Sequence, residues 1–234
     1  MSRAVAVATE RLILRPWTEA DRAPFRDLCG SPTVMEFLGG PWNAERVDAS
    51  IDRHRACQEA HGHCFWAIER KEDGAFLGFC GLRVDYSPGT PIADDVEIGW
   101  RLAEHAWGRG YAREAAAASL AWAWANLAAR RVVAITIPAN VRSWGLMERL
   151  GMVRDAALDF DDPEFPADHP HARLITYVAH RPAASAASGC CELTAEFGRD
   201  LRLVGLKLDR AGGQGRSRDQ IGAGRWIRRY DELA

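Results

Sequence analysis

The sequence predicts a mixed α/β fold in which one sheet carries helices on both faces. Residues 131–138 read RVVAITIP, a continuously apolar and β-branched run that is typical of a strand buried on both faces. Residues 64–85 hold two apolar and aromatic runs around an Asp-Gly pair, which predicts a β-hairpin. Segments with helical periodicity separate these strands from others, and this order of elements favours a layered α/β architecture.

The first half of the chain supplies a strand and two helices before the hairpin. Residues 11–17, RLILRPW, alternate as a strand does and end at a proline. Thr18 and Asp21 then have the spacing of a capping box, which predicts a helix after the strand. Asn43 is a good N-cap for a second helix that continues through residue 61.

The second half alternates strands and helices around the buried strand. Residues 94–102, DDVEIGWRL, are a predicted strand, and a helix is expected over residues 110–128. A short helix over residues 142–151 follows the buried strand and ends at a glycine. Two more strands are expected over residues 152–160 and 172–180, joined by the acidic, proline-rich loop DDPEFPADHPH.

Composition excludes several classes of protein. The formal net charge of -2 and the pI of about 6.4 give no global basic field, so long nucleic acid is a poor candidate partner. The six cysteines show neither a C-x-x-C pair nor the spacing of a disulfide framework, which predicts a reduced, cytoplasmic protein. The apolar stretch near the N-terminus is too short for a signal peptide or a membrane span, so no membrane partner is expected.

The character of the sequence changes at Pro182. RPAASAASG has the composition of a linker, and RAGGQGRSRDQIGAGRW is rich in Gly and Arg without a periodic apolar face. Between Pro182 and Ala234, nine Lys or Arg residues are interleaved with seven Asp or Glu residues. We therefore predict one domain over residues 1–181 and a weakly structured C-terminal extension over residues 182–234, with a nucleic-acid-binding arm as the alternative.

HAWGRGYAREAA, residues 105–116, places two glycines one residue apart before an alanine-rich helical run. Glycine permits a tight turn and a close approach of a ligand, and the first N–H groups of a helix are unpaired and attract anions. A phosphate is therefore the expected ligand. A Walker loop requires a Lys-Ser/Thr pair that this stretch lacks, and the dinucleotide fingerprint requires a small residue where Arg113 stands.

VEIGWRLAEHAWGRGYAREAA, followed after one helix by RVVAITIPANVRSWGLMERLGM, resembles the GNAT superfamily of acetyl-coenzyme A dependent N-acetyltransferases. More narrowly, it is similar to the RimJ/RimL-like branch, which contains ribosomal-protein N-terminal acetyltransferases. The resemblance spans about residues 9–180. It implies a GNAT-like, mostly antiparallel mixed sheet that is splayed between the strands near Glu97 and Ile135. It also implies acetyl-CoA as co-substrate, no metal, an amine acceptor, and the homodimers that are common in such proteins.

Carried over by residue, the resemblance implies that the backbone amides from Trp107 to Ala112 bind the pyrophosphate of the coenzyme. The strand at residues 97–102 would lie beside the pantetheine arm, and Asn140 would contact that arm. Asn140 and Ser143 are also ordinary residues for the start of a helix. His105 stands three residues before the first glycine, where the wider superfamily often has Gln or Arg. The predicted coenzyme-binding residues are Ile98, Trp100, Leu102, Trp107, Gly108, Arg109, Gly110, Tyr111, Ala112, Asn140 and Ser143.

Acyl transfer to an amine needs a neutral amine, but a free alkyl amine is mostly protonated near pH 7. Glu97 is the candidate general base, acting through water, and the alternative is a structural ion pair with Arg101 or Arg149. A main-chain N–H of the same strand would bind the oxyanion. Many superfamily members have a tyrosine seven residues after the asparagine. Met147 stands there, so Ser143 is the remaining candidate catalytic hydroxyl.

The resemblance therefore predicts direct transfer of the acetyl group to a primary amine, either a protein N-terminus or a small amine. The replacement of the usual tyrosine favours a non-catalytic acyl-CoA-binding sensor as the first alternative. The second alternative is a nucleic-acid-associated protein that acts through its Gly/Arg tail.

Three weaker patterns remain. His54, Cys57 and His61 have helical spacing, with His63 and Cys64 close behind, but an amphipathic helix that runs into a strand explains them better than a zinc site does. The acidic loop could attract a cationic amine or simply be solvated; its carboxylates are Asp161, Asp162, Glu164 and Asp168. Three tryptophans are expected to be core residues or groove walls, namely Trp42, Trp66 and Trp100.

Overall fold

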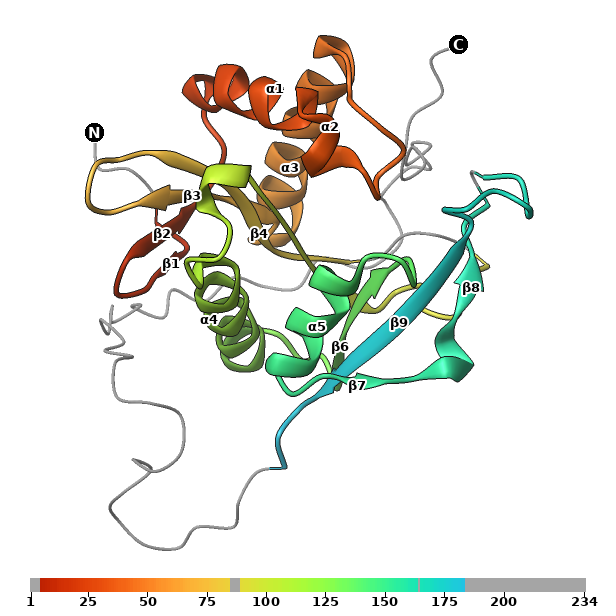
Figure 1. The fold of residues 1–234 in the computed structure, drawn as a ribbon. Helices are drawn as coiled ribbons and strands as arrows, with labels where there is room; N and C mark the ends of the chain where they lie inside the picture. Colours follow the sequence, from red (N-terminus) through yellow and green to blue (C-terminus); the bar gives the residue numbers. More distant parts are fainter. Residues whose placement is uncertain (1–4, 85–88, 164, 184–234) are drawn as a thin grey trace, which may run out of the picture.

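The computed structural model describes residues 5–84, 89–163 and 165–183 (Figure 1). One sheet has the strand order β1-β2-β3-β4-β5-β6-β9-β7, and β8 pairs with β9 outside this path. All neighbouring strands are antiparallel except β5 and β6. The predicted fold class is therefore confirmed. The strands are β1 (Val7–Ala8), β2 (Leu12–Arg15), β3 (Phe65–Arg70), β4 (Phe76–Val84), β5 (Val96–Leu102), β6 (Arg131–Thr136), β7 (Val153–Arg154), β8 (Phe160–Asp161) and β9 (Arg173–His180).

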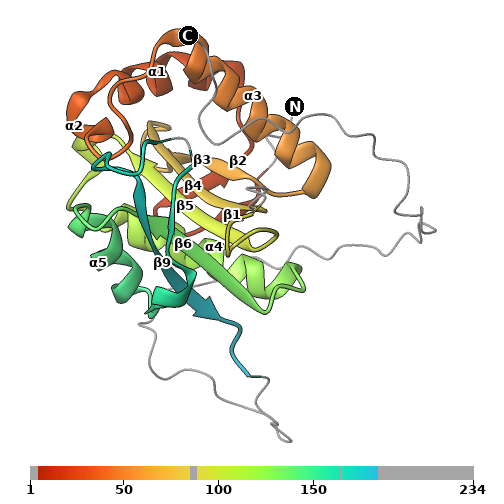
Figure 2. The same cartoon turned by 90° about the vertical axis from the view of Figure 1, so that its right-hand side faces the viewer.

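Helices cover both faces of this sheet, as the sequence predicts. Figure 2 shows α1, α2 and α3 over one face and α4 and α5 over the other. The α-helices are α1 (Arg22–Gly30), α2 (Pro32–Met35), α3 (Ala44–His61), α4 (Tyr111–Asn126) and α5 (Val141–Arg149). Short 3-10 turns are η1 (Glu19–Asp21), η2 (Glu104–Ala106) and η3 (Ala156–Leu158). Within the described residues, no helix combines the length and the apolar character needed to cross a membrane.

Local side chains explain where several helices begin and end. The Asn43 side chain accepts a hydrogen bond from the Arg46 N–H, and Gly62 closes α3 with a positive φ of 74°. The short helix α2 was not predicted, because four residues carry no periodic signal. Ser31 caps it by accepting from the Val34 N–H, with Pro32 at the first helical position.

The predicted strand over residues 152–160 is wrong, because the segment divides into β7, η3 and β8. Asp155 accepts a hydrogen bond from the Ala157 N–H at 3.1 Å and starts the turn η3. Asp159 accepts from the Thr176 N–H on β9 at 3.0 Å and pairs with Arg154. The two aspartates therefore satisfy backbone donors locally, in competition with a regular strand ladder.

The core under α1 and α3 is aromatic, and His54 belongs to it. The His54 ring stacks on Trp17 with centroids 5.4 Å apart and lies 5.7 Å from Phe79. Burial lowers the pKa of His54 well below its usual value, so this side chain is neutral at pH 7. Trp66 is fully buried, whereas Trp42 and Trp100 are half-buried. Among the residues that the structure describes, no group of three His, Cys, Asp or Glu side chains could hold a metal.

A buried ion network fixes β2 to the rest of the domain. Arg15 donates to both carboxylate oxygens of Asp21 at 2.8 Å and to Glu69 on β3 at 2.8 Å. The Arg15 and Asp21 side chains are each 3% exposed. We expect Asp21→Asn to lower the free energy of unfolding by about 3–5 kcal/mol, because it leaves a buried guanidinium without its main counterion. Urea unfolding measures this loss, and a loss below about 1 kcal/mol would show that water reaches the network.

The predicted C-terminal extension lies outside the described residues, apart from Pro182 and Ala183. Its Gly/Arg segment is therefore not placed. Glu164 of the acidic loop also lies outside the described residues. The division into a domain over residues 1–181 and an extension remains a prediction.

Candidate active site

Strands β5 and β6 are joined at one end and separate at the other. Their parallel ladder consists of Val96 opposite Val132 and Glu97 opposite Val133. Next to these pairs, Arg131 donates to the Asp95 carboxylate at 2.7 Å and holds the joined end together. Beyond Glu97, the ladder to β6 stops while β5 continues to Leu102, so alternate backbone groups of β5 face the gap. This is the splay that was predicted.

Side chains of β5 alternate between the two faces of the sheet. Cys80 on β4 is paired with Trp100 on β5 and lies 3.8 Å from Ser119 of α4. Trp100 therefore belongs to the α4 face, and so do Ile98 and Leu102. Ile98 and Leu102 are buried and Trp100 is half-buried. Glu97, Gly99 and Arg101 belong to the opposite face, under α1 and α3. The predicted arm-binding residues and the candidate base thus lie on one strand but on different faces.

The glycine turn leads directly into α4 with its backbone donors exposed. Gly108 and Gly110 have positive φ values of 69° and 80°, a conformation that other residues rarely adopt. Gly110 is the N-cap of α4, and no side chain caps the helix there. The backbone N–H groups of Gly108 to Arg113 make no hydrogen bond to a protein acceptor within the described residues. Trp107 and Ala112 are half-buried, Tyr111 is buried, and Arg109 is exposed.

An ionic clamp from the turn between β1 and β2 fixes this glycine turn, and the sequence did not reveal it. Arg11 donates through Nη1 to the Arg109 carbonyl at 3.0 Å and through Nε to Glu114 at 2.7 Å. The Arg11 N–H and the Thr9 hydroxyl also donate to Glu114. The Arg109 carbonyl is thereby held toward Arg11. A site for an anion needs its carbonyls turned away from the ligand, and this contact provides that.

The clamp depends on a charged Glu114. Burial on its own raises the pKa of Glu114, but the hydrogen bonds from Thr9 and Arg11 outweigh it and hold the pKa below 4.5. A depressed pKa contributes stability that is present above pH 4.5 and is lost as the pH falls through the folded-state value.

We expect Glu114→Gln to weaken binding of an anionic ligand at the turn about 3–10-fold, because the clamp loses its ionic character. Calorimetric titration at pH 7 measures this change. The gap in melting temperature between wild type and variant should shrink below pH 4.5. Asp73→Asn, which breaks the surface pair with Arg70 in the β3–β4 turn, is the matched control. Equal affinities of wild type and Glu114→Gln would show that the clamp does not position the turn.

Asn140 and Ser143 lie at the start of α5, beside the end of β6. The Asn140 side chain caps the helix by accepting from the Ser143 N–H at 3.3 Å. Asn140 therefore has the helix-capping role that the sequence offered as an alternative to coenzyme binding. Both residues are half-buried. Arg142, also in the first turn of α5, lies over the Trp107 ring at 5.0 Å and so connects α5 to the glycine turn.

Glu97 is 6% exposed and is held by an arginine that sequence reasoning did not select. Arg83 on β4 donates to Glu97 Oε2 through Nε at 3.0 Å and through Nη2 at 2.9 Å. The register places Arg83 directly opposite Glu97, and this pairing takes the place of the suggested pairs with Arg101 or Arg149. The carboxylate is therefore buried, paired with Arg83 and fixed beside the point where β5 and β6 separate.

Met147 stands where a tyrosine was expected, and its side chain is 1% exposed, within the core. Tyr177 on β9 donates to Glu148 on α5 at 3.4 Å. Ser143 remains the half-buried hydroxyl of the predicted set.

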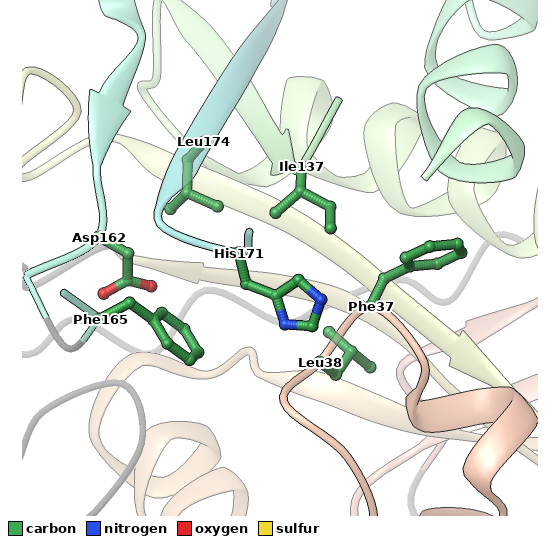
Figure 3. Close-up of a pocket in the computed structure, with 7 residues that line it drawn as sticks. All are labelled: Phe37, Leu38, Ile137, Asp162, Phe165, His171 and Leu174. Atoms are coloured by element: carbon green, nitrogen blue, oxygen red, sulfur yellow. The ribbon is translucent and has the colours of Figure 1, made fainter. Parts of the chain in front are cut away.

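A small cleft opens on the α1–α3 face beside the end of β6 (Figure 3). It encloses about 220 Å³, including its open mouth. Asp162 is 3% exposed there, and the Nδ1 atom of His171 is buried without a hydrogen-bond partner among the described residues. Figure 3 shows the His171 ring at the centre of the lining residues, which are Phe37, Leu38, Ile137, Asp162, Phe165, His171 and Leu174. Of the acidic loop, Asp162 is thus inside the protein, whereas Asp161 and Asp168 are exposed.

Comparison with known proteins shows the family of this chain. Residues 11–153 match the family described as Acetyltransferase (GNAT) domain. The chain belongs to the GNAT acetyltransferase family. Its fold matches the crystal structure of an acetyltransferase from Agrobacterium tumefaciens str. C58, with 32% identity, a TM-score of 0.61, and coverage of 77% of this chain and 96% of that chain.

Two further proteins resemble this chain, one in sequence and one in fold. The Bacillus subtilis protein YkkB, itself uncharacterized, is 29% identical over 153 residues, which are 65% of this chain and 87% of that protein. RimL, a ribosomal L7/L12 α-N-protein acetyltransferase solved in complex with coenzyme A, is 15% identical with a TM-score of 0.61, and the match covers 76% and 98% of the two chains. At this identity, the likeness to RimL concerns the fold. The GNAT assignment supports an acyltransferase.

Proposed function

We propose that this GNAT protein transfers the acetyl group of acetyl-CoA directly to a primary amine. The observation that carries the proposal is the glycine turn. Its N–H groups from Gly108 to Ala112 are unpaired within the described residues and lie where the alanine-rich helix α4 begins. These donors fit a diphosphate, since the end of a helix and a glycine-rich backbone both favour an anion. The predicted coenzyme-binding residues are consistent with this placement and remain part of the proposal.

The unpaired edge of β5 would hold the arm of the coenzyme. Past Glu97, alternate N–H and C=O groups of this strand can pair with amides as another strand would. Asn140, which follows β6 and caps α5, would contact this arm. When bound there, the coenzyme supplies an activated acetyl thioester at the splay.

Glu97 would act as general base through water. The amine nitrogen gains a bond to the acetyl carbon, the bond from that carbon to sulfur breaks, and the proton lost by the amine goes to Glu97. A β5 N–H would bind the developing oxyanion. The departing thiolate takes a proton from the Ser143 hydroxyl, which regains one through solvent as Glu97 releases the proton of the amine. Buried Glu97, paired with Arg83, lies on the α1–α3 face that also holds the small cleft.

The acceptor is proposed as a small amine or a protein N-terminus, the latter following the RimJ/RimL-like resemblance and the fold match to RimL. We place the activity in the cytoplasm, in line with the cysteine pattern.

A thiol-release assay with acetyl-CoA and a panel of primary amines tests the proposal. Release of thiol that depends on an amine, together with mass-spectrometric detection of its acetyl product, is the expected result. A non-catalytic acyl-CoA sensor is the second candidate, because the buried Met147 replaces the usual tyrosine. Tight coenzyme binding without turnover of any amine would favour the sensor.

A further inference from the structure

Among the residues that the structure describes, no carboxylate pairs with the positively charged Arg101 of β5. Its guanidinium carbon lies 4.4 Å from the centroid of the Trp42 ring and 5.4 Å from that of Phe79. Its one hydrogen bond within the described residues goes from Nη1 to the Cys29 sulfur at 3.3 Å. A thiol is a weak acceptor, and Cys29 is fully buried. The cation is therefore packed between aromatic rings and a thiol.

Two hydrogen-bond donors in this cluster are buried and find no acceptor within the described part of the chain. They are the Nε atom of Arg101 and the Nε1 atom of Trp42. Buried donors almost always have a partner, because removing one from water without replacing its hydrogen bond is unfavourable. Two such donors beside one uncompensated charge indicate that an anionic group completes the cluster.

The position of the cluster indicates which ligand brings that group. Arg101 and Glu97 are four residues apart on one strand, so both lie on the α1–α3 face. The glycine turn begins α4, on the opposite face. Trp42 belongs to the segment between α2 and α3, which also supplies Phe37 and Leu38 to the small cleft. The cluster therefore lies on the acceptor side of the proposed site, away from the turn that would hold the coenzyme phosphates.

We propose that the acceptor amine also carries a carboxylate, which Arg101 and Trp42 bind. This inference rests on the proposed function. The planar guanidinium suits a carboxylate, which can accept hydrogen bonds through both oxygens. A strand rises about 3.3 Å per residue, so the Cα atoms of Glu97 and Arg101 are on the order of 13 Å apart. The amine and the carboxylate are then separated by several bonds, as in an ω-amino acid or a short peptide.

The first test compares ω-amino acids of increasing chain length with alkylamines of the same length. We expect wild type to prefer the best amino acid by at least about tenfold in kcat/KM. Arg101→Met, which keeps the apolar stem, should raise KM for that acceptor about 10–100-fold and leave its kcat and the alkylamine kinetics nearly unchanged. Trp42→Phe keeps a ring and removes the second donor, so a smaller rise in KM is expected.

Arg26→Met is the matched control, because Arg26 is a surface arginine of α1 that pairs with Asp48. It should keep the preference for the carboxylate. Turnover of alkylamines and amino acids at equal efficiency by wild type would overturn the inference and leave the acetyltransferase proposal intact. An equal loss for both kinds of acceptor in Arg101→Met would overturn it too, because the residue would then have a structural role only.

The second test does not depend on turnover. Butyrate, which carries a carboxylate and no amine, is titrated into the protein and followed by NMR. We expect saturable shifts of the Trp42 indole N–H signal in wild type and in Arg26→Met, and none in Arg101→Met. Absence of saturable shifts in wild type would overturn the inference. Arg101-dependent binding without acetylation of any amine would support the carboxylate site while rejecting the proposed function.

Discussion

Replacing Gly108 by valine is expected to weaken coenzyme binding by about 100-fold or more. A β-branched residue does not adopt the φ of 69°, so the turn must change and its N–H groups no longer point together. Loss of about two hydrogen bonds to a charged phosphate, each contributing about 1.5–3 kcal/mol, gives this magnitude. Gly110→Val should act in the same way and also crowd Arg11, whose Nη2 atom would lie 3.4 Å from the new Cβ. Calorimetric titration with acetyl-CoA measures both effects.

Gly74→Val provides a close control for Gly108→Val. Gly74 has a φ of 73° and, like Gly108, no atom within 4 Å of an added Cβ. Both substitutions should cost about 1–2 kcal/mol of folding free energy, since both force a side chain into the left-handed region. Only Gly108→Val should lose the coenzyme. Equal coenzyme affinities in the two variants would contradict the placement of the diphosphate.

Glu97→Gln is expected to lower kcat about 10²–10⁴-fold, the range that general-base catalysis contributes. KM for acetyl-CoA should change little, because the carboxylate faces the acceptor side. The low-pH limb of the pH–rate profile should also disappear. Steady-state kinetics with the best amine from the panel measure these effects.

The variant Arg83→Gln distinguishes a catalytic role of Glu97 from a purely structural role in its ion pair with Arg83. If Glu97 serves only to pair with Arg83, both substitutions should destabilise the protein alike and have similar effects on kcat. If Glu97 is the base, Arg83→Gln retains the carboxylate and most of kcat. A Glu97→Gln enzyme that keeps more than about a tenth of kcat would remove Glu97 from the catalytic role.

Much of the fold was predictable, because its signals are local. The cap at Asn43, the Asp-Gly hairpin and the buried strand at residues 131–138 each depend on a few neighbouring residues. The break of the predicted strand at residues 152–160 was missed. It depends on Asp159, which accepts from the Thr176 N–H on a strand that comes later in the chain.

The candidate site was predictable only in part, for a related reason. The local sequence predicts the glycine turn, but the Arg11–Glu114 clamp joins residues that are 103 positions apart. The partner of Glu97 depends on the register of β4 against β5, which pairs it with Arg83. The orphan donors of Arg101 and Trp42 become visible only when burial is known. Sequence patterns therefore indicate the backbone site, whereas the side-chain partners need the three-dimensional packing.

A crystal structure of this protein with coenzyme A tests the central claim most directly. We expect the diphosphate within hydrogen-bond distance of backbone N–H groups between Trp107 and Ala112, with the pantetheine arm along the free edge of β5. A diphosphate bound anywhere else on the protein would contradict the account.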